Sequence, residues 1–254
     1  MIVLEFAVAI IAGIFAGLTG GGGGIIYVPL LIAMGESPIS AVAASNLAIV
    51  ITTVAATIHN ARAGLVPWKR VGMIAIGAVI MGPIGSYLGL RLSSLALLIG
   101  LIVLNLINLV VIELRSRKVA PSSDLRDAED HGSTNPVKIA STGAAGGLLA
   151  GLFGIGGGIV MVPLQVGWLH TPIRVAARIS LAVIIVTSGS AFIGYLIQGG
   201  FVDWSRAIML GIGGVIGAPI GSHFLRRISA HTATRILQVV LVFVTLSLVW
   251  RALT

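Results

Sequence analysis

A cluster of glycines between two apolar arms occurs twice in this chain, once in each half. Residues 13–30 read GIFAGLTGGGGGIIYVPL and residues 147–164 read GLLAGLFGIGGGIVMVPL, so the two copies align without a gap. Consecutive glycines interrupt a helix, because a backbone without side chains is poorly restricted to helical angles. Hydrophobic segments broken at corresponding positions of two halves are typical of duplicated membrane transporters, which bind a solute at the breaks.

The composition indicates a membrane protein. Hydrophobic residues make up 57% of the chain and charged residues 9%, whereas soluble domains carry about 25% charged residues. The net charge of +8 comes from Lys and Arg in short loops between apolar segments, a pattern of membrane topology rather than of nucleic-acid binding. We predict an all-α polytopic membrane protein in contact with the lipid bilayer and with no nucleic-acid partner. Its apolar segments cover residues 2–34, 38–58, 71–90, 95–112, 137–169, 175–197, 207–225 and 236–250.

The internal repeat defines the predicted domains. Ser37-Pro38 corresponds to Thr171-Pro172, and each pair predicts a helix start with a hydroxyl N-cap and a proline at the first helical position. The segment between the halves is polar and lacks apolar periodicity, so it is expected to be a solvated linker. We predict an N-terminal membrane repeat at 1–114, a polar linker at 115–136 and a C-terminal membrane repeat at 137–254.

Two topologies fit the broken segments 2–34 and 137–169. The arm after each break has about 11 residues, too short to span a bilayer alone. If both arms enter and leave on one side, each half has three spans and the halves are inverted; if they cross, each half has four spans and the halves are parallel. With the linker in the cytoplasm, the inverted topology leaves only Arg91, Arg206 and Arg251 outside. The positive-inside rule therefore favours inverted repeats, each with a re-entrant, glycine-broken helix pair plus three spanning helices.

The breaks are the predicted solute site. The helix that begins after each break directs free N–H groups and the positive end of its dipole at the glycines, which favours an anion. Close helix packing is the alternative role for such glycines, and we assign that role to Gly82, Gly85, Gly89, Gly213, Gly217 and Gly221, which follow helical spacing. Polar side chains of the next helix add uncharged hydrogen-bonding groups, or serve only to bond neighbouring helices. The predicted substrate-binding residues are Gly20, Gly21, Gly22, Gly23, Gly24, Ser45, Asn46, Gly154, Gly156, Gly157, Gly158, Ser180 and Thr187.

Other chemistry is disfavoured by what the sequence lacks. The chain has no Cys, and no Asp or Glu stands at the centre of an apolar span, so a metal site or a carboxylate proton relay is not expected. There is no nucleophile elbow, no zinc-protease motif and no P-loop, so we expect neither an enzyme nor a cofactor, and no direct use of ATP by this chain.

The duplicated glycine motif with its following proline, together with the pattern ending at Arg91 and Ser93, resembles the sulfite exporter TauE/SafE family, also called the toluene sulfonate uptake permease family. The resemblance covers nearly the whole chain outside the linker. It implies a secondary transporter of small sulfur-containing anions, such as sulfite, sulfonates or sulfoacetate, in a bacterial or archaeal inner membrane. A channel-like facilitator, a carrier for another small solute, and a non-transport membrane subunit remain alternatives, and a homo-oligomer is possible.

Overall fold

The computed structural model describes residues 2–116 and 135–224, together with positions 235, 238, 239, 242, 245 and 246. Most of the predicted linker and of the last apolar segment therefore lies outside the described residues. Every regular element within them is a helix. The helices are α1 (Ile2–Thr19), α2 (Gly24–Ala33), α3 (Pro38–Arg62), α4 (Trp68–Arg91), α5 (Ser94–Ser116), α7 (Pro136–Phe153), α8 (Gly158–Trp168), α9 (Ile173–Ile197) and α10 (Trp204–Phe224).

The helix boundaries follow local sequence signals, with one exception. As predicted, α2 and α8 begin at the last glycine of each cluster, and Ser37 caps α3 by accepting a hydrogen bond from the Ser40 N–H. The equivalent prediction for Thr171 is wrong, because α9 begins at Ile173 with Pro172 as its N-cap. The Thr171 hydroxyl instead accepts a hydrogen bond from Arg70 of the other half, 3.2 Å away.

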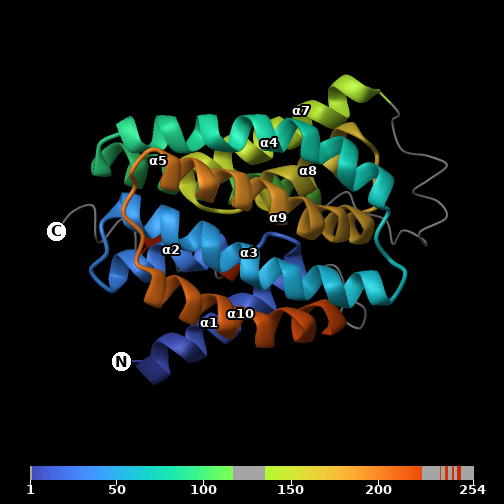
Figure 1. Cartoon of the computed structure of the whole chain (residues 1–254). Coiled ribbons are helices and arrows are strands. Elements are labelled where there is room, and N and C mark those ends of the chain that lie inside the picture. The colour runs from blue at the N-terminus through green and yellow to red at the C-terminus, as the bar shows by residue number, and fades with distance from the viewer. Residues whose placement is uncertain are drawn as a thin grey trace.

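Corresponding helices of the two halves run in opposite directions. In Figure 1, α3 runs from left to right and α9 from right to left, and α4 and α10 are likewise opposed. The start of α1 and the end of α2 lie at the left of this view, whereas the start of α7 and the end of α8 lie at the right. Both glycine breaks therefore lie inside the bundle and are approached from opposite ends.

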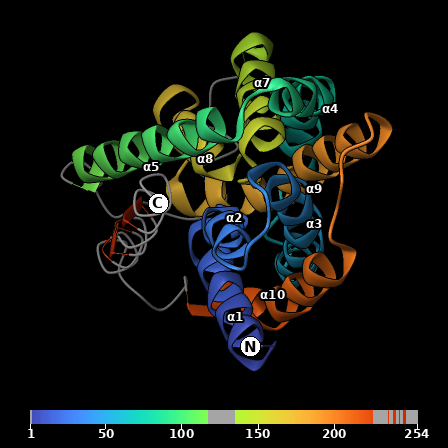
Figure 2. The same cartoon turned by 90° about the vertical axis from the view of Figure 1, so that its left-hand side faces the viewer.

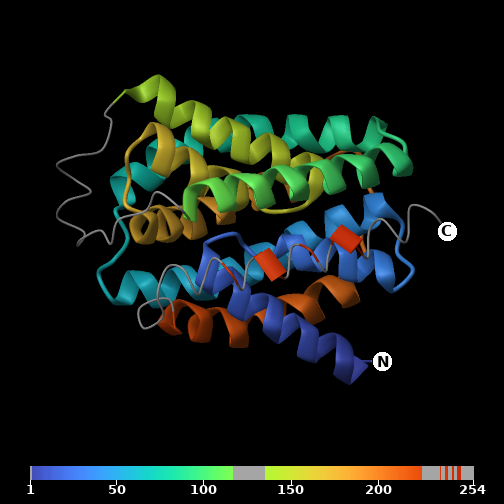
Figure 3. The same ribbon diagram turned by 180° about the vertical axis from the view of Figure 1, so that it is seen from behind.

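The outer helix of each half packs on helices of the other half. Helix α4 of the first half packs on α7 and α9, and α10 of the second half packs on α1 and α3. Seen along the bundle in Figure 2, α4 and α7 form one side and α1 and α10 the other, with α2, α3, α8 and α9 between them. Helix α5 contacts α3, α7 and α8, and Figure 3 shows it beside α7 at the back of the molecule.

Small residues permit the close approach of these helix pairs, as predicted. A Cβ on Gly85 would overlap the Leu148 carbonyl of α7, and one on Gly217 would overlap the Ile10 carbonyl of α1. A Cβ would likewise overlap an atom of a neighbouring helix at the other four predicted glycines, Gly82, Gly89, Gly213 and Gly221. The two predicted packing faces are therefore the contact surfaces of α4 and α10, where only a hydrogen atom fits between backbones.

Within residues 2–116 and 135–224, four helices are long and apolar enough to cross a membrane: Pro38–Arg62, Trp68–Arg91, Ile173–Ile197 and the Trp204–Gly221 part of α10. Helices α3 and α9 are largely buried, whereas α4 and α10 carry exposed isoleucines along one face, including Ile76, Ile80, Ile212 and Ile216. An exposed apolar face this long suits contact with lipid tails rather than water. The breaks lie against the two buried helices, with Gly20 beside Ala177 of α9 and Gly154 beside Val42 of α3.

Candidate functional site

The two glycine breaks have the same backbone conformation. All residues of 20–24 and of 154–158 are buried. The backbone has positive φ at the first, third and fourth position of each break: 69°, 81° and 81° at Gly20, Gly22 and Gly23, and 65°, 76° and 76° at Gly154, Gly156 and Gly157. Glycine adopts this left-handed region readily and other residues do not. The repeated glycines therefore build one turn twice.

The breaks lie against each other at the centre of the bundle. A Cβ on Gly24 would lie 2.5 Å from the Gly154 oxygen and 2.6 Å from Cα of Ile155. In the reciprocal contact, a Cβ on Gly158 would meet the Gly20 oxygen and lie 3.1 Å from Cα of Gly21. The first residue of each short helix thus packs against the break of the other half, which brings the predicted glycines of both halves into one site.

Both short helices begin without a side-chain cap. Their N-caps are Gly23 and Gly157, neither helix start has a capping side-chain hydrogen bond, and neither first turn contains an acidic residue. The first N–H groups of a helix have no partner within the helix, and its N-terminus carries a partial positive charge. Two such ends, buried and opposed, form an electropositive centre made without charged side chains, which is a suitable environment for an anion.

Three of the predicted polar side chains donate to backbone carbonyls in the second break or in the last turn of α7 before it. Ser45 Oγ donates to the Gly154 oxygen at 2.8 Å, and Thr187 Oγ1 donates to the Gly156 oxygen at 2.9 Å. Asn46 Nδ2 donates to the Ala150 oxygen at 3.1 Å and to the Val42 oxygen at 3.0 Å. The Ser45 and Thr187 bonds reach carbonyls of the break itself, whereas the Ala150 carbonyl that Asn46 reaches also accepts the Gly154 N–H of its own helix. Hydrogen bonding of an anion by Asn46 stays a prediction.

Ser180, the residue that the repeat aligns with Asn46, has a different environment. Its hydroxyl accepts a hydrogen bond of 2.8 Å from Nε2 of Gln165 on α8. Gln165 is fully buried and was not among the predicted site residues, although an amide inside an apolar arm is a signal that could have identified it. A direct contact of Ser180 with a solute also stays a prediction.

Three further side chains lie at the breaks and were missed. Ile49 of α3 and Ile184 of α9 are the nearest side chains to both Gly22 and Gly156. Ser188 Oγ lies 3.5 Å from the position of a Cβ on Gly156. This hydroxyl is fully buried and has no hydrogen-bond partner among the residues that the structure describes; Asn46 Oδ1 and Gln165 Oε1 also have none, but these oxygens can only accept. A buried polar group without a partner is costly in a purely structural role, so Ser188 is the side chain best suited to bind a solute here.

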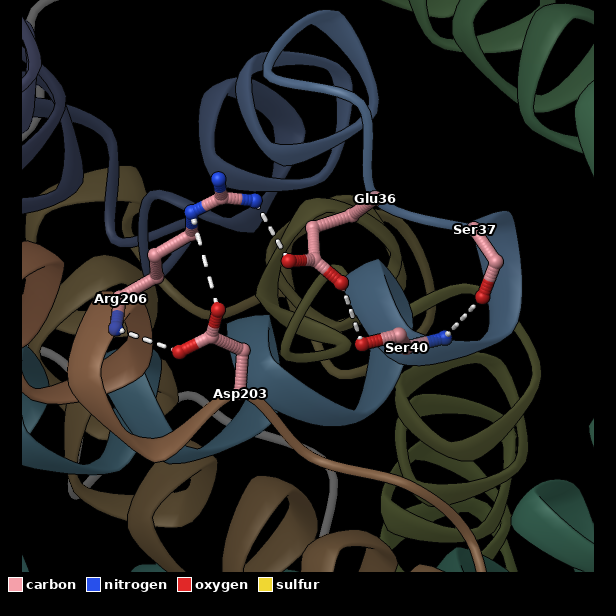
Figure 4. A network of polar contacts seen from close by, with 5 residues as sticks. All are labelled: Glu36, Ser37, Ser40, Asp203 and Arg206. Atoms are coloured by element: carbon pink, nitrogen blue, oxygen red, sulfur yellow. Dashed lines mark hydrogen bonds and ion pairs between the residues drawn. The ribbon is translucent and has the colours of Figure 1, made fainter. Parts of the chain in front are cut away.

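Polar contacts between the halves lie at both ends of the bundle. Figure 4 shows Arg206 of α10 forming an ion pair with Glu36, in the loop before α3, and contacting Asp203 in its own half. Glu36 also accepts a hydrogen bond of 2.7 Å from the Ser40 hydroxyl. Arg70, the repeat equivalent of Arg206, instead donates to the neutral Thr171 at the opposite end. Both connections therefore join the first half of the chain to the second.

The described residues contain no group of three or more His, Cys, Asp or Glu side chains arranged to hold a metal ion. The glycine-break centre is thus the site that the chain's geometry defines most clearly.

Comparison with known proteins decides the family. The model of the family described as sulfite exporter TauE/SafE matches residues 5–248, which is nearly the whole chain. The chain belongs to this family. Its members are membrane transporters, and the chain is an integral membrane transporter by this relationship and by its apolar helices.

Curated relatives match most of the length of this TauE/SafE protein. A probable membrane transporter protein, YunE, from Bacillus subtilis is 25% identical and covers 98% of this chain and 99% of its own. One from Xylella fastidiosa is 29% identical, covering 95% of this chain and 92% of its own. MJ0441 from Methanocaldococcus jannaschii, also a probable membrane transporter protein, is 27% identical over 89% and 87% of the two chains. No solved structure matches the chain significantly.

Proposed function

We propose that this protein is a secondary transporter of small sulfur-containing anions, of the sulfite, sulfonate or sulfoacetate type. One observation carries the proposal: the uncapped N-termini of α2 and α8 are buried and lie against each other's break. An oxyanion offers several acceptor oxygens to such N–H groups. Because the donors carry no formal charge, the anion is bound without being held too tightly to leave.

In this mechanism the backbone N–H groups of 22–24 and 156–158 bind the anion. The Ser188 hydroxyl, which has no partner in the part of the chain that the structure describes, donates to it as well. Ser45 and Thr187 hold the carbonyls of the second break by hydrogen bonds. They thereby fix the direction of its N–H groups, since carbonyl and amide orientations are coupled through the planar peptide.

The two halves act as inverted repeats in this proposal. The opposed directions of α3 and α9, and of α4 and α10, support that arrangement, in which the two broken pairs are re-entrant. Rocking of one half against the other gives the anion alternating access to the two sides. The linker at 115–136 lies in the cytoplasm and the protein in a bacterial or archaeal inner membrane, as a monomer or a homo-oligomer.

The anionic charge of the substrate rests on the electropositive centre, which fits any small oxyanion. Its sulfur chemistry rests on the family description. A channel-like facilitator, a carrier for another solute and a non-transport subunit are therefore the competing outcomes of the test. A cation carrier is the weakest of these, because neither short helix has an acidic residue in its first turn.

Ligand-dependent stabilisation of the purified protein in detergent tests the proposal. Sulfite, thiosulfate, sulfate, sulfoacetate, taurine and chloride are each titrated while the melting temperature is recorded, since a ligand that binds the folded state raises it. We expect at least one sulfur anion to raise the melting temperature and chloride to have little effect. A protein stabilised by none of these anions would refute the assignment of an anion substrate.

The variant Ser188→Ala locates the site without disturbing the fold, because it removes a hydroxyl that bonds none of the described residues. A hydrogen bond to a charged ligand contributes about 1.5–3 kcal/mol, so we expect the anion to bind roughly 10- to 100-fold more weakly. Ser141→Ala is the control, because that hydroxyl bonds only the Lys138 carbonyl of its own helix. Equal affinities in wild type and Ser188→Ala would move the site away from the breaks.

A further inference from the structure

Two isoleucines cover the electropositive centre. Ile49 and Ile184 are fully buried. A Cβ on Gly24 would lie 2.6 Å from Cδ1 of Ile49, and a Cβ on Gly158 would lie 2.5 Å from Cδ1 of Ile184. Each isoleucine therefore places its terminal methyl group at the first residue of the short helix in its own half, which is where the N–H groups begin.

The same two side chains also meet between the breaks. A Cβ on Gly22 would lie 3.1 Å from Cγ2 of Ile49 and 3.2 Å from Cγ2 of Ile184, and a Cβ on Gly156 would have the same two neighbours at the same distances. Ile49 and Ile184 thus contact both breaks. They form an apolar pair at the point where the two electropositive ends come together.

Methyl groups accept no hydrogen bonds, so a fixed isoleucine wall would leave the N–H groups of two buried helix ends unmatched. A side chain that can move aside for an anion avoids that permanent cost. Isoleucine in a helix has one strongly preferred χ1, which fixes Cγ2, but rotation about χ2 carries Cδ1 alone between staggered positions. The atom that covers each helix end is therefore the most mobile atom of the side chain.

We propose that Ile49 and Ile184 form an apolar gate that covers the anion site and sets the largest anion it admits. This inference rests on the proposed function and adds its size selectivity. The terminal methyl groups turn aside to uncover the N–H groups, and the space that they release limits the group attached to sulfur. Small anions such as sulfite need less displacement than sulfoacetate or taurine.

Isoleucine-to-valine substitution tests the gate, because it deletes only Cδ1 and keeps the branched Cγ2. Ile49→Val, Ile184→Val and the double variant are compared with wild type for binding of sulfite, sulfoacetate and taurine, each titrated against the melting temperature. A single methylene in an apolar pocket changes discrimination by roughly 10- to 200-fold. We expect the double variant to favour sulfoacetate and taurine, which carry larger groups on sulfur, over sulfite by about 10-fold more than wild type does, with the single variants between.

Ile74→Val is the matched control. Ile74 is also buried, and its Cγ2 lies 3.1 Å from the position of a Cβ on Gly143 of α7, so it packs on a glycine away from the breaks. Its substitution should leave the ratio of affinities unchanged. If wild type binds sulfite and the single and double gate variants keep its preference, the gate is refuted while the anion site stands. If wild type binds none of the three, the proposed function fails and the gate fails with it.

Discussion

The N-cap glycines of the two short helices allow a sharp test of the tertiary packing. Gly23 and Gly157 are equivalent in the repeat, both are N-caps, and their φ angles are 81° and 76°. Alanine in this left-handed region costs about 1–2 kcal/mol, and the cost should be the same at both positions. From the sequence and the local conformation alone, Gly23→Ala and Gly157→Ala would be expected to destabilise the protein equally.

The surroundings of the two glycines differ. A Cβ on Gly23 would lie 3.2 Å from Cε2 of Tyr27 and 3.3 Å from the Ala12 oxygen, which small shifts can relieve. A Cβ on Gly157 would overlap the Gly146 carbonyl of α7, with Cα of Gly146 at 2.8 Å. Backbone cannot turn away as a side chain can, and overpacking of this kind typically adds about 1–3 kcal/mol. We expect a loss of about 1–2 kcal/mol for Gly23→Ala and about 2–5 kcal/mol for Gly157→Ala.

Thermal unfolding in detergent, with ligand-free wild type alongside, measures the difference. Gly157→Ala should melt at a clearly lower temperature than Gly23→Ala, and Gly72→Ala is a control for helical glycine, because a Cβ there meets nothing within 4 Å. If Gly23→Ala and Gly157→Ala lower the melting temperature by the same amount, the close contact between α7 and the start of α8 does not determine stability, and the reasoning is refuted.

Two further predictions concern hydrogen bonds and charges around the breaks. Thr187→Val should lower the free energy of unfolding by about 1 kcal/mol, because it removes the hydrogen bond to the Gly156 oxygen. Thr53→Val is the control and should cost less, because the Thr53 hydroxyl bonds carbonyls of its own helix. Equal losses of stability would contradict the role given to Thr187. A double-mutant cycle of Glu36→Gln and Arg206→Gln should give a coupling free energy of about 1 kcal/mol, because the Glu36 side chain is only 11% exposed. This coupling should decrease as salt is added. A coupling of zero would mean that the ion pair adds nothing to the contact between the halves.

The breaks themselves could be predicted from the sequence, because their cause is local. Consecutive glycines end one helix, and the next begins where side chains resume, so the starts of α2 and α8 were predicted correctly. The packing faces of α4 and α10 were also predictable, because small residues at helical spacing are typical of helices whose backbones approach closely. Thr171 shows the limit of local reasoning, since a partner from the other half, Arg70, takes the hydroxyl that would have capped α9.

The gate residues could not be found in the same way. The repeat aligns Ile49 with Val183, not with Ile184, so alignment does not indicate the spatial pairing of the two isoleucines. In an apolar chain, an isoleucine facing lipid and one facing the centre have the same sequence signal. Ser188 was visible as a hydroxyl in an apolar helix, but so were several others, and only the structure distinguishes it as the one beside Gly156 without a partner.

The sequence by itself determined that the chain lies in a membrane, that it is duplicated, and that each half contains one broken helix pair, because hydrophobicity and glycine conformation act over a few residues. The tertiary structure decided that the two breaks meet, that Ser45, Asn46 and Thr187 bond carbonyls at the end of α7 and in the break that follows, and that Ile49 and Ile184 cover the helix ends. These features depend on contacts between the halves, and such contacts are set by how whole helix faces fit together rather than by any short stretch of sequence.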